Sequence, residues 1–424
     1  MFFYEYEYEN ENGYNWKRVY YNVPDAEEVK DSLQRISTIC REELKNMYLD
    51  QSIPRSYLKY ELDQIRRNKL AVEIEILFES LEIGREKGYT EELYIPPFSG
   101  TLTLFLLRKK LGLPAMNPLP PHYRCDLDGY VKFDEKQTGY GMNLPDCKCP
   151  RCGKMLKKDG YDLLKYQNPI YAELEIPLAP SVHKIICSAI AERFRRVKPE
   201  KSIEYRRILY TSFSKAEIIG NLRKRIGPVP NEYEKQVLRK TLKNIKENFI
   251  AWVEPFSLKP GISGFAPSGI VEISVDDFQM KPGISELLPA GIEEIRVCDF
   301  QTLVRLYCYI YGNFGKPKCV SDLTNPFFFV SKEELADKLL SYGVPKKEAY
   351  VFGMKAPYIN EEWKKIYDTY RIPPEMQELC YSTIRLSSRF EGVWCGQLQY
   401  QEAWYQIHYP KEYEECSAPF REST

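Results

Sequence analysis

The stretch "NPLPPHYRCDLD" (residues 117–128) interrupts a largely helical sequence. It marks a boundary between the segment before it and the segment after it. Its three prolines remove backbone donors, so no helix continues through it. His122 forms no recognisable pair with a nucleophilic serine or cysteine, and we expect it to support the loop that follows. The stretch therefore predicts the start of a polar, cysteine-bearing insert.

Two short segments of this insert carry metal-ligand spacing. Cys125 and Asp128 are separated by two residues, and Cys149 and Cys152 repeat that spacing in "CKCPRCG". Such turns present two ligands to one tetrahedral ion, and zinc accepts a carboxylate oxygen as well as thiolates. We expect these four residues to hold a structural Zn²⁺, with Cys147 as a substitute ligand. The alternative is a decayed site whose cysteines are free thiols.

A pair of acids lies in "IYAELEIPLAP" (170–180), where apolar residues alternate with Glu173 and Glu175. A strand places every second side chain on the same face, so both carboxylates would project together. Paired carboxylates suit a metal site, but the same pattern is typical of a half-buried strand with one face in water. The residues alone leave both interpretations open.

Composition narrows the class of protein. The chain has 424 residues, of which 43% are apolar and 28% are charged, as in a soluble globular protein. It contains no apolar run of about 18 residues, so we expect no membrane span. The opening "MFFYEYEYENENGYNW" is acidic and aromatic and lacks the pattern of a signal peptide. The sequence therefore predicts a cytoplasmic protein with reduced thiols.

Charge is distributed unevenly although the formal net charge is zero. Residues 193–247 contain sixteen lysines and arginines against six glutamates. An uneven field of this kind can bind a polyanion, whereas the alternative is a solvated helical face. The candidates for nucleic-acid contact are Arg223, Lys224, Arg225, Arg239 and Lys240.

Periodicity predicts both helices and strands along the chain. Residues 1–24 are expected to be poorly structured or to form a sheet edge. The basic segment that ends at residue 247 and the last 120 residues are expected to be mostly helical. Helices are further predicted over 25–47, 56–88 with a break near 68, and 182–196, and strands over 170–176, 269–274 and 292–300.

Three segments together resemble a known family. "NPLPPHYRC" with "LPDCKCPRCGKMLKKDGYD", then "ISGFAPSGIVEIS" (262–274), then "YQEAWYQIHYPKEY" (400–413) follow in order along the chain. They resemble the C-family replicative DNA polymerases, of the PolC type of bacterial DNA polymerase III alpha subunit. The resemblance covers roughly residues 50–415 and implies a role with DNA and with replication proteins.

The resemblance implies an α+β fold with a nucleotidyltransferase-type palm, a small cysteine-rich zinc insert, a helical thumb and helical fingers. The thumb falls where the basic excess lies. The implied division is an N-terminal segment at 1–50, a first palm segment at 51–204 with the zinc insert at 121–160, a thumb at 205–261, a second palm segment at 262–300 and fingers at 301–424.

The positions of the catalytic aspartates differ from the family pattern. The family's P-D-x-D corresponds to "AELE" (172–175), which puts Glu173 and Glu175 at two positions, and the third position falls on Glu294. In the family three aspartates hold two Mg²⁺ ions. One added methylene moves a carboxylate by about 1.5 Å, and a misplacement of about 1 Å can cost about a hundredfold in rate. Mg²⁺ is expected here only if this palm site is active.

Nucleotide-binding positions also differ. The family's G-S-R-G-S turn corresponds to "PPFSGT" (96–101), so Ser99 replaces the arginine that would clamp a phosphate. In the fingers motif Arg389 retains a positive charge, but Glu391 replaces a histidine. All of these changes are expected to weaken the binding of nucleotide or metal.

Three functions remain open from the sequence. The first is a catalytically degenerate polymerase relative that acts as a DNA-binding or replication-associated module. The second is a minimal active DNA polymerase or nucleotidyltransferase with a Glu173, Glu175 and Glu294 metal site. The third is a protein-interaction module that binds no nucleic acid.

Overall fold

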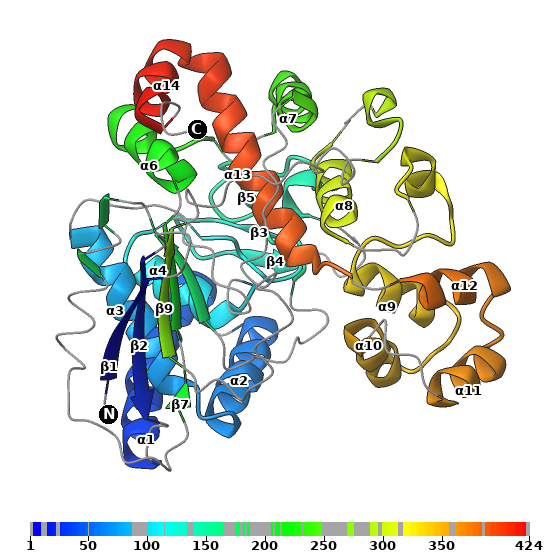
Figure 1. The fold of residues 1–424 in the computed structure, drawn as a ribbon, viewed down its shortest axis with the longest axis horizontal. Helices are drawn as coiled ribbons and strands as arrows, with labels where there is room; N and C mark the ends of the chain where they lie inside the picture. The colour runs from blue at the N-terminus through cyan, green and yellow to red at the C-terminus, as the bar shows by residue number, and fades with distance from the viewer. Residues whose placement is uncertain are drawn as a thin grey trace. The chain divides into compact units, whose positions relative to one another are not determined.

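The computed structural model contains the helices and strands drawn in Figure 1. It divides into two compact units. Unit 1 comprises Met1–Pro228, Val253–Gln279 and Lys411–Thr424, and unit 2 comprises Val229–Trp252 and Met280–Pro410. Both helices and strands are present, which confirms the α+β class. The structure describes residues 3–9, 15–22, 26–49, 51–86, 100–113, 115–133, 140–163, 174–178, 181–182, 185–186, 205–206, 208–212, 214–230, 233–247, 269–274, 289–295, 299–312, 317–355, 361–383 and 386–420.

Four helices build the core of unit 1. They are α1 (Ala26–Tyr48), α2 (Ser52–Arg67), α3 (Ala71–Glu86) and α4 (Leu102–Lys110). The first helix packs against the other three and buries a stripe that includes Ile36, Cys40 and Leu44. The helices predicted over 25–47 and 56–88, with a break near residue 68, are confirmed where the structure describes them.

A buried carboxylate fixes the start of α4. Glu61 of α2 accepts hydrogen bonds from the backbone N–H groups of Leu102 and Thr103 and from the Thr103 hydroxyl, each at 2.8 Å. Thr101 caps the same helix by accepting from the Leu104 N–H at 3.2 Å. Burial raises the pKa of Glu61 to about 7, although the three donors act in the opposite direction.

A mixed six-stranded sheet belongs to the same unit. Its main path runs β1 (Phe3–Glu9), β2 (Asn15–Asn22), β9 (Gly269–Ser274), β8 (Ile208–Ser212) and β6 (Leu174–Leu178), with β7 (Tyr205–Arg206) paired to β2. The β6–β8 and β8–β9 pairs are parallel, and the others are antiparallel. The strand predicted over 269–274 is confirmed, the one predicted at 170–176 is described from Leu174, and β1 forms an edge.

A second, three-stranded antiparallel sheet carries the cysteine-bearing insert. Its order is β4 (Val131–Phe133), β3 (His122–Arg124) and β5 (Lys157–Asp159). Next to it, the proline-rich stretch pairs with the chain after β5, since Asn117, Pro118 and Leu119 carbonyls accept from residues 161–163. Gly160, at φ 101°, makes this close approach possible: a Cβ there would lie 2.4 Å from the Pro120 carbonyl oxygen.

His122 lies in a buried polar network. Its Nδ1–H donates to the Pro120 carbonyl at 2.7 Å, and its Nε2 lies 3.4 Å from the Tyr48 hydroxyl. The Asn117 amide donates to the Tyr48 hydroxyl at 2.6 Å and to Asp159 at 2.8 Å. Burial lowers the pKa of His122. These contacts agree with the expectation that His122 supports the loop that follows it.

The basic segment contains strands as well as helices. Helices α6 (Ser214–Ile226) and α7 (Lys235–Glu247) lie within it as expected. Residues 205–206 and 208–212, however, form β7 and β8, so the helical prediction is wrong there. The physical reason is that β8 pairs with β6 and β9, which are distant in sequence and invisible to local periodicity.

Unit 2 is helical, and α13 packs against α7 and α8 within it. The helices predicted for the last 120 residues are confirmed. The strand predicted over 292–300 is wrong where it is described, because a glycine-led 3-10 turn, η5 (Ile292–Glu294), occupies its start and a helix begins at Phe300. The further elements of unit 2 are α8 (Phe300–Tyr311), η6 (Val320–Thr324), α9 (Lys332–Ser341), α10 (Lys346–Lys355), α11 (Glu361–Tyr370), α12 (Pro374–Ser382) and α13 (Arg389–His408). The chain then returns to unit 1 with α14 (Pro410–Ser417) and η7 (Ala418–Phe420).

Within the described part of the chain, no helix has the length and apolar character needed to cross a bilayer.

Candidate metal centre

Two turns of the cysteine-bearing insert have the same pattern of backbone hydrogen bonds. In the first, the Gly129 N–H donates to the Cys125 carbonyl at 3.1 Å, and in the second the Gly153 N–H donates to the Cys149 carbonyl at 2.9 Å. Each leading cysteine also donates its own N–H five residues ahead, at 2.8 and 2.7 Å. Both glycines adopt positive φ, 68° and 73°. The two turns are therefore structural duplicates.

This duplication places Asp128 where the second turn has Cys152. Both residues lie three positions after the leading cysteine and directly before the positive-φ glycine. The backbone hydrogen bonds are the same in both turns, although a carboxylate oxygen is a harder ligand than a thiolate. Asp128 is consequently held in a ligand position of a zinc-knuckle type of turn.

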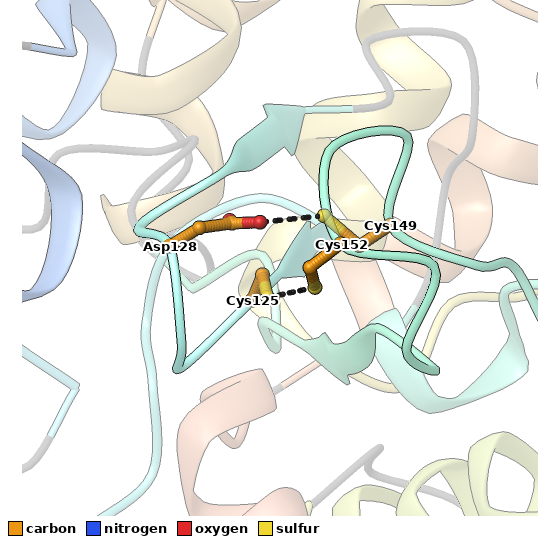
Figure 2. A group of neighbouring side chains, drawn as sticks. All are labelled: Cys125, Asp128, Cys149 and Cys152. Carbon is orange, nitrogen blue, oxygen red and sulfur yellow. Dashed lines mark hydrogen bonds between the residues drawn. The ribbon is translucent and has the colours of Figure 1, made fainter.

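The four ligand atoms converge (Figure 2), all lying within 4.8 Å of one another. The Cys125 and Cys152 sulfurs are 3.6 Å apart, and the Cys149 sulfur is 3.1 Å from Asp128 Oδ2. A tetrahedral zinc with Zn–S bonds of about 2.3 Å sets neighbouring ligand atoms roughly 3.5–3.8 Å apart. The residues present thus fit a four-coordinate Zn²⁺ with three sulfurs and one oxygen.

Burial and charge also suit a cation. Cys125 and Cys149 are buried, Asp128 is half-buried and Cys152 is exposed. The Asp128 carboxylate has a pKa lowered to about 2, chiefly because the Cys149 thiol and then the Tyr130 N–H donate hydrogen bonds to it. It is ionised at neutral pH and available as an oxygen ligand.

Neighbouring side chains support the turns. Arg151 donates to the Asp128 carbonyl at 3.3 Å, and its guanidinium lies 5.6 Å from the centre of the Tyr130 ring. A small apolar cluster packs against the two buried cysteines, and it comprises Tyr123, Leu144, Leu156 and Tyr130. Cys147 is exposed, bonds to the Lys148 carbonyl and lies outside the group of four.

The three predicted catalytic acids are not brought into one described site. Glu173 lies outside the described residues. Glu175 is in β6 of unit 1, at the register position opposite Leu209 of β8. Glu294 is exposed at the end of η5, in unit 2. The three-carboxylate site stays a prediction.

The predicted nucleotide-binding positions have other contacts where they are described. Ser99 lies outside the described residues. The Arg389 guanidinium lies 3.2 Å from Asp337, and its backbone N–H donates to Glu333 at 2.7 Å. Glu391 forms a capping box with Ser388 at the start of α13, with distances of 2.8 and 3.2 Å. Both residues therefore stabilise the first turn of that helix.

The predicted phosphate-contact residues lie on two helices. In α6, Arg223 is half-buried and Lys224 is exposed, and Arg225 pairs with Glu415 at 2.5 Å, which raises the pKa of the arginine. This carboxylate partly neutralises the positive charge of α6. In α7, Arg239 is exposed and Lys240 is half-buried.

Sequence reasoning missed two members of a cationic stripe on α7. Lys235 and Lys243 are exposed like Arg239, and the three are spaced four residues apart along one face. The opposite face is buried through Val237, Leu242 and other residues. The i, i+4, i+8 spacing of these three residues in the sequence could have predicted the stripe.

Comparison with known proteins gives the family relationship. No family model matches the chain. It is 44% identical over 71 residues to the PolC-type DNA polymerase III of Thermotoga petrophila, a match that covers 16% of this chain and 5% of the relative. Matches at 33% identity over 142 residues to that of Latilactobacillus sakei, and at 32% over 139 residues to that of Bacillus subtilis, cover 33% and 32% of this chain.

These matches span a tenth or less of the length of the curated relatives, covering 5%, 9% and 9% of them. Within those limits, the chain is similar to several PolC-type DNA polymerase III enzymes, from which its sequence has diverged.

Proposed function

We propose that this chain is a DNA-binding, replication-associated module built on a polymerase palm, thumb and fingers, and that it does not transfer nucleotides. The observation that carries the proposal is the first turn of α13. The two residues that correspond to the family's nucleotide-binding motif, Arg389 and Glu391, are engaged in contacts within the chain.

The chemistry of this turn opposes triphosphate binding. The Arg389 guanidinium already faces the Asp337 carboxylate, and Glu391 adds a second negative charge close by. A phosphate approaching this turn would meet carboxylates where bidentate arginine contacts are needed. Glutamates in place of three aspartates, and a serine in place of the phosphate-clamping arginine, act in the same direction.

Support for DNA binding comes from charge and from the relatives. The stripe Lys235, Arg239 and Lys243 lies on the exposed face of α7, within the segment that the resemblance assigns to the thumb. A cationic row on a rigid helix suits contact with successive phosphates. Zinc, bound by the two duplicate turns, would hold the insert in its fold and leave no open coordination position for chemistry.

An active enzyme is the second candidate. Its support is the retention of a carboxylate at all three metal positions, Glu173, Glu175 and Glu294, since other residue types would also be compatible with an abandoned site. In that case the three glutamates would hold Mg²⁺ or Mn²⁺ for nucleotidyl transfer.

Primer extension separates the two candidates. The chain is mixed in excess with a labelled primer–template, all four dNTPs, and Mg²⁺ or Mn²⁺, and the products are followed through a single turnover. We expect no extended primer. Extension by the wild-type chain that disappears in Glu173→Ala would refute the proposal and establish the active enzyme.

A salt series tests the DNA-binding component of the proposal. Fluorescence anisotropy of a labelled primer–template should show affinity that falls steeply with salt. Removing one stripe charge, as in Arg239→Ala, should reduce the slope of log K against log[salt] by about 0.9. Lys347→Ala, an exposed lysine on α10, is the matched control and should leave the slope unchanged. No binding at low salt would favour a protein-interaction module instead.

A further inference from the structure

An open groove of about 1050 Å³ lies between α1 and α2 in unit 1. Each helix contributes one face to it, because the lining positions follow helical spacing on both. Its accessible apolar part comes from the half-buried Leu33 and the exposed Leu49, whereas Leu44, Leu58 and Leu62 are buried beneath it. The groove therefore offers a small aliphatic surface at Leu33 and Leu49.

Positive charge borders this groove. Arg41 and Lys45 of α1 are spaced i, i+4, and so are Arg55 and Lys59 of α2. Among the described residues, Arg41, Lys45 and Lys59 form no ion pair. Like charges gathered on two neighbouring helices repel one another, so a negatively charged occupant would relieve that repulsion.

Only one acid lies among the residues that line the groove, Asp63, and it is already neutralised. Its carboxylate pairs with Arg66 at 2.5 Å and with Arg67 at 2.7 Å, both on α2. The lining thus carries a clear excess of positive charge, which selects for an acidic partner.

Leu49 gives a second, independent indication. It follows α1 with φ 50°, a conformation that β-carbon-bearing residues rarely adopt, and the residue is 48% exposed. It lines the groove and lies against the backbone of Gly129 in the first cysteine turn. An exposed leucine in a strained conformation at the end of an apolar groove is suited to contact with a partner.

We propose that this groove binds an acidic amphipathic helix of a partner protein. Leucine-type side chains of that helix lie on Leu33 and Leu49, and its glutamates or aspartates face Arg41, Lys45 and Lys59. This is helix-in-groove recognition with charge fixing the orientation. The groove does not involve α7, so the inference stands apart from the proposed DNA-binding function.

The lining favours a peptide over a nucleic acid. Single-stranded nucleic acids are held by aromatic platforms on which bases stack, and Tyr60 is the one aromatic residue among those that line the groove. Leucines offer nothing to a sugar–phosphate backbone but do offer a matching surface to another leucine-rich helix.

The test uses a synthetic, fluorescein-labelled helical peptide of about 18 residues, which spans about 27 Å. It carries leucines along one face and glutamates on both flanks, and a matched peptide carries lysines in place of the glutamates. Fluorescence anisotropy with the full chain should show saturable binding of the acidic peptide and none of the lysine peptide. Raising the salt concentration should weaken the binding.

Charge reversal assigns the binding to the groove. Lys45→Glu and Lys59→Glu should each lower the affinity for the acidic peptide by about fivefold or more. Lys132→Glu, at an exposed lysine of β4, is the matched control and should leave binding unchanged. Leu49→Asn should also weaken binding while the Tm is unchanged or higher, because asparagine tolerates positive φ.

Several outcomes would overturn the inference. They are no saturable binding of the acidic peptide, equal binding of the lysine peptide, or no effect of either lysine reversal. If labelled single-stranded DNA binds instead, and loses affinity in Lys45→Glu and Lys59→Glu but not in Lys132→Glu, then the groove is a nucleic-acid site and the peptide proposal is wrong.

Discussion

At the scale of single residues, predictability depends on how far apart the partners lie in sequence. Cys125, Asp128, Cys149 and Cys152 could be predicted as one group because each turn is local and its spacing is visible. Glu61 could not, since its donors at Leu102 and Thr103 lie 41 and 42 residues further along the chain. A buried glutamate in a helix gives no sequence signal until its partners are known.

The raised pKa of Glu61 has a consequence for stability. A carboxyl group whose pKa is raised from 4.5 to about 7 on folding binds a proton more tightly in the folded state. Its contribution to the free energy of unfolding is therefore greatest below pH 4.5 and decreases as the pH rises towards 7, by up to roughly 3 kcal/mol. Chemical denaturation at several pH values measures this.

Substitution isolates the contribution of Glu61. Glu61→Gln should lose this pH-dependent component, and it should lower the free energy of unfolding by about 1–3 kcal/mol at pH 7, because the amide NH₂ would face the backbone donors of α4. Glu86→Gln, at the exposed end of α3, should retain the wild-type pH dependence. An unchanged pH profile in Glu61→Gln would show that Glu61 is not the titrating group.

At the scale of elements, periodicity predicts helices well and strand partners poorly. The helix over 25–47 and the helices of the last 120 residues could be predicted because their apolar stripes repeat locally. The short strands β7 and β8 could not, since they lie in a basic segment and are fixed by pairing with distant strands. The turn at η5 likewise depends on Gly291, whose φ is 78°.

Gly160 tests the pairing between the proline-rich stretch and the chain after β5. In Gly160→Ala the new Cβ would meet two backbone carbonyl oxygens, at 2.4 and 2.7 Å, which cannot rotate away. Gly227→Ala is the matched control, because its φ of 117° is similar but no atom lies within 4 Å of the new Cβ. Both variants should lose about 1–2 kcal/mol through backbone strain.

The clash should cost Gly160→Ala at least about 2 kcal/mol more than the control, in the range known for overpacked sites. Urea denaturation followed by circular dichroism measures the difference. Equal losses in the two variants would mean that the pairing does not constrain the fold.

At the scale of the whole molecule, the unfolding of the two compact units can be followed by different spectroscopic signals. The cysteine turns belong to unit 1, whereas four of the five tryptophans belong to unit 2, with Trp16 the exception. Tryptophan emission therefore reports mainly on unit 2. Because each unit has its own core, loss of the proposed zinc should affect the units unequally.

Zinc removal should show this inequality. Structural zinc contributes directly to the folding of the segment that binds it. A strong chelator should therefore lower the temperature at which unit 1 unfolds, as followed by far-ultraviolet circular dichroism. The main transition in tryptophan fluorescence should stay at the same temperature. Cys149→Ser should reproduce the effect without chelator, and Cys147→Ser should not. If both transitions moved together, the units would not be independent.

The duplicated cysteine turns have a consequence for protein engineering. Position 128 is held by a glycine-ended turn with the same backbone hydrogen bonds as the turn that presents Cys152, so we expect a thiolate to fit there without redesign of the backbone. Aspartate, cysteine or histidine at this single position would favour different divalent metals. The insert is in this sense a scaffold on which metal preference can be adjusted one side chain at a time, while the fold around it stays constant.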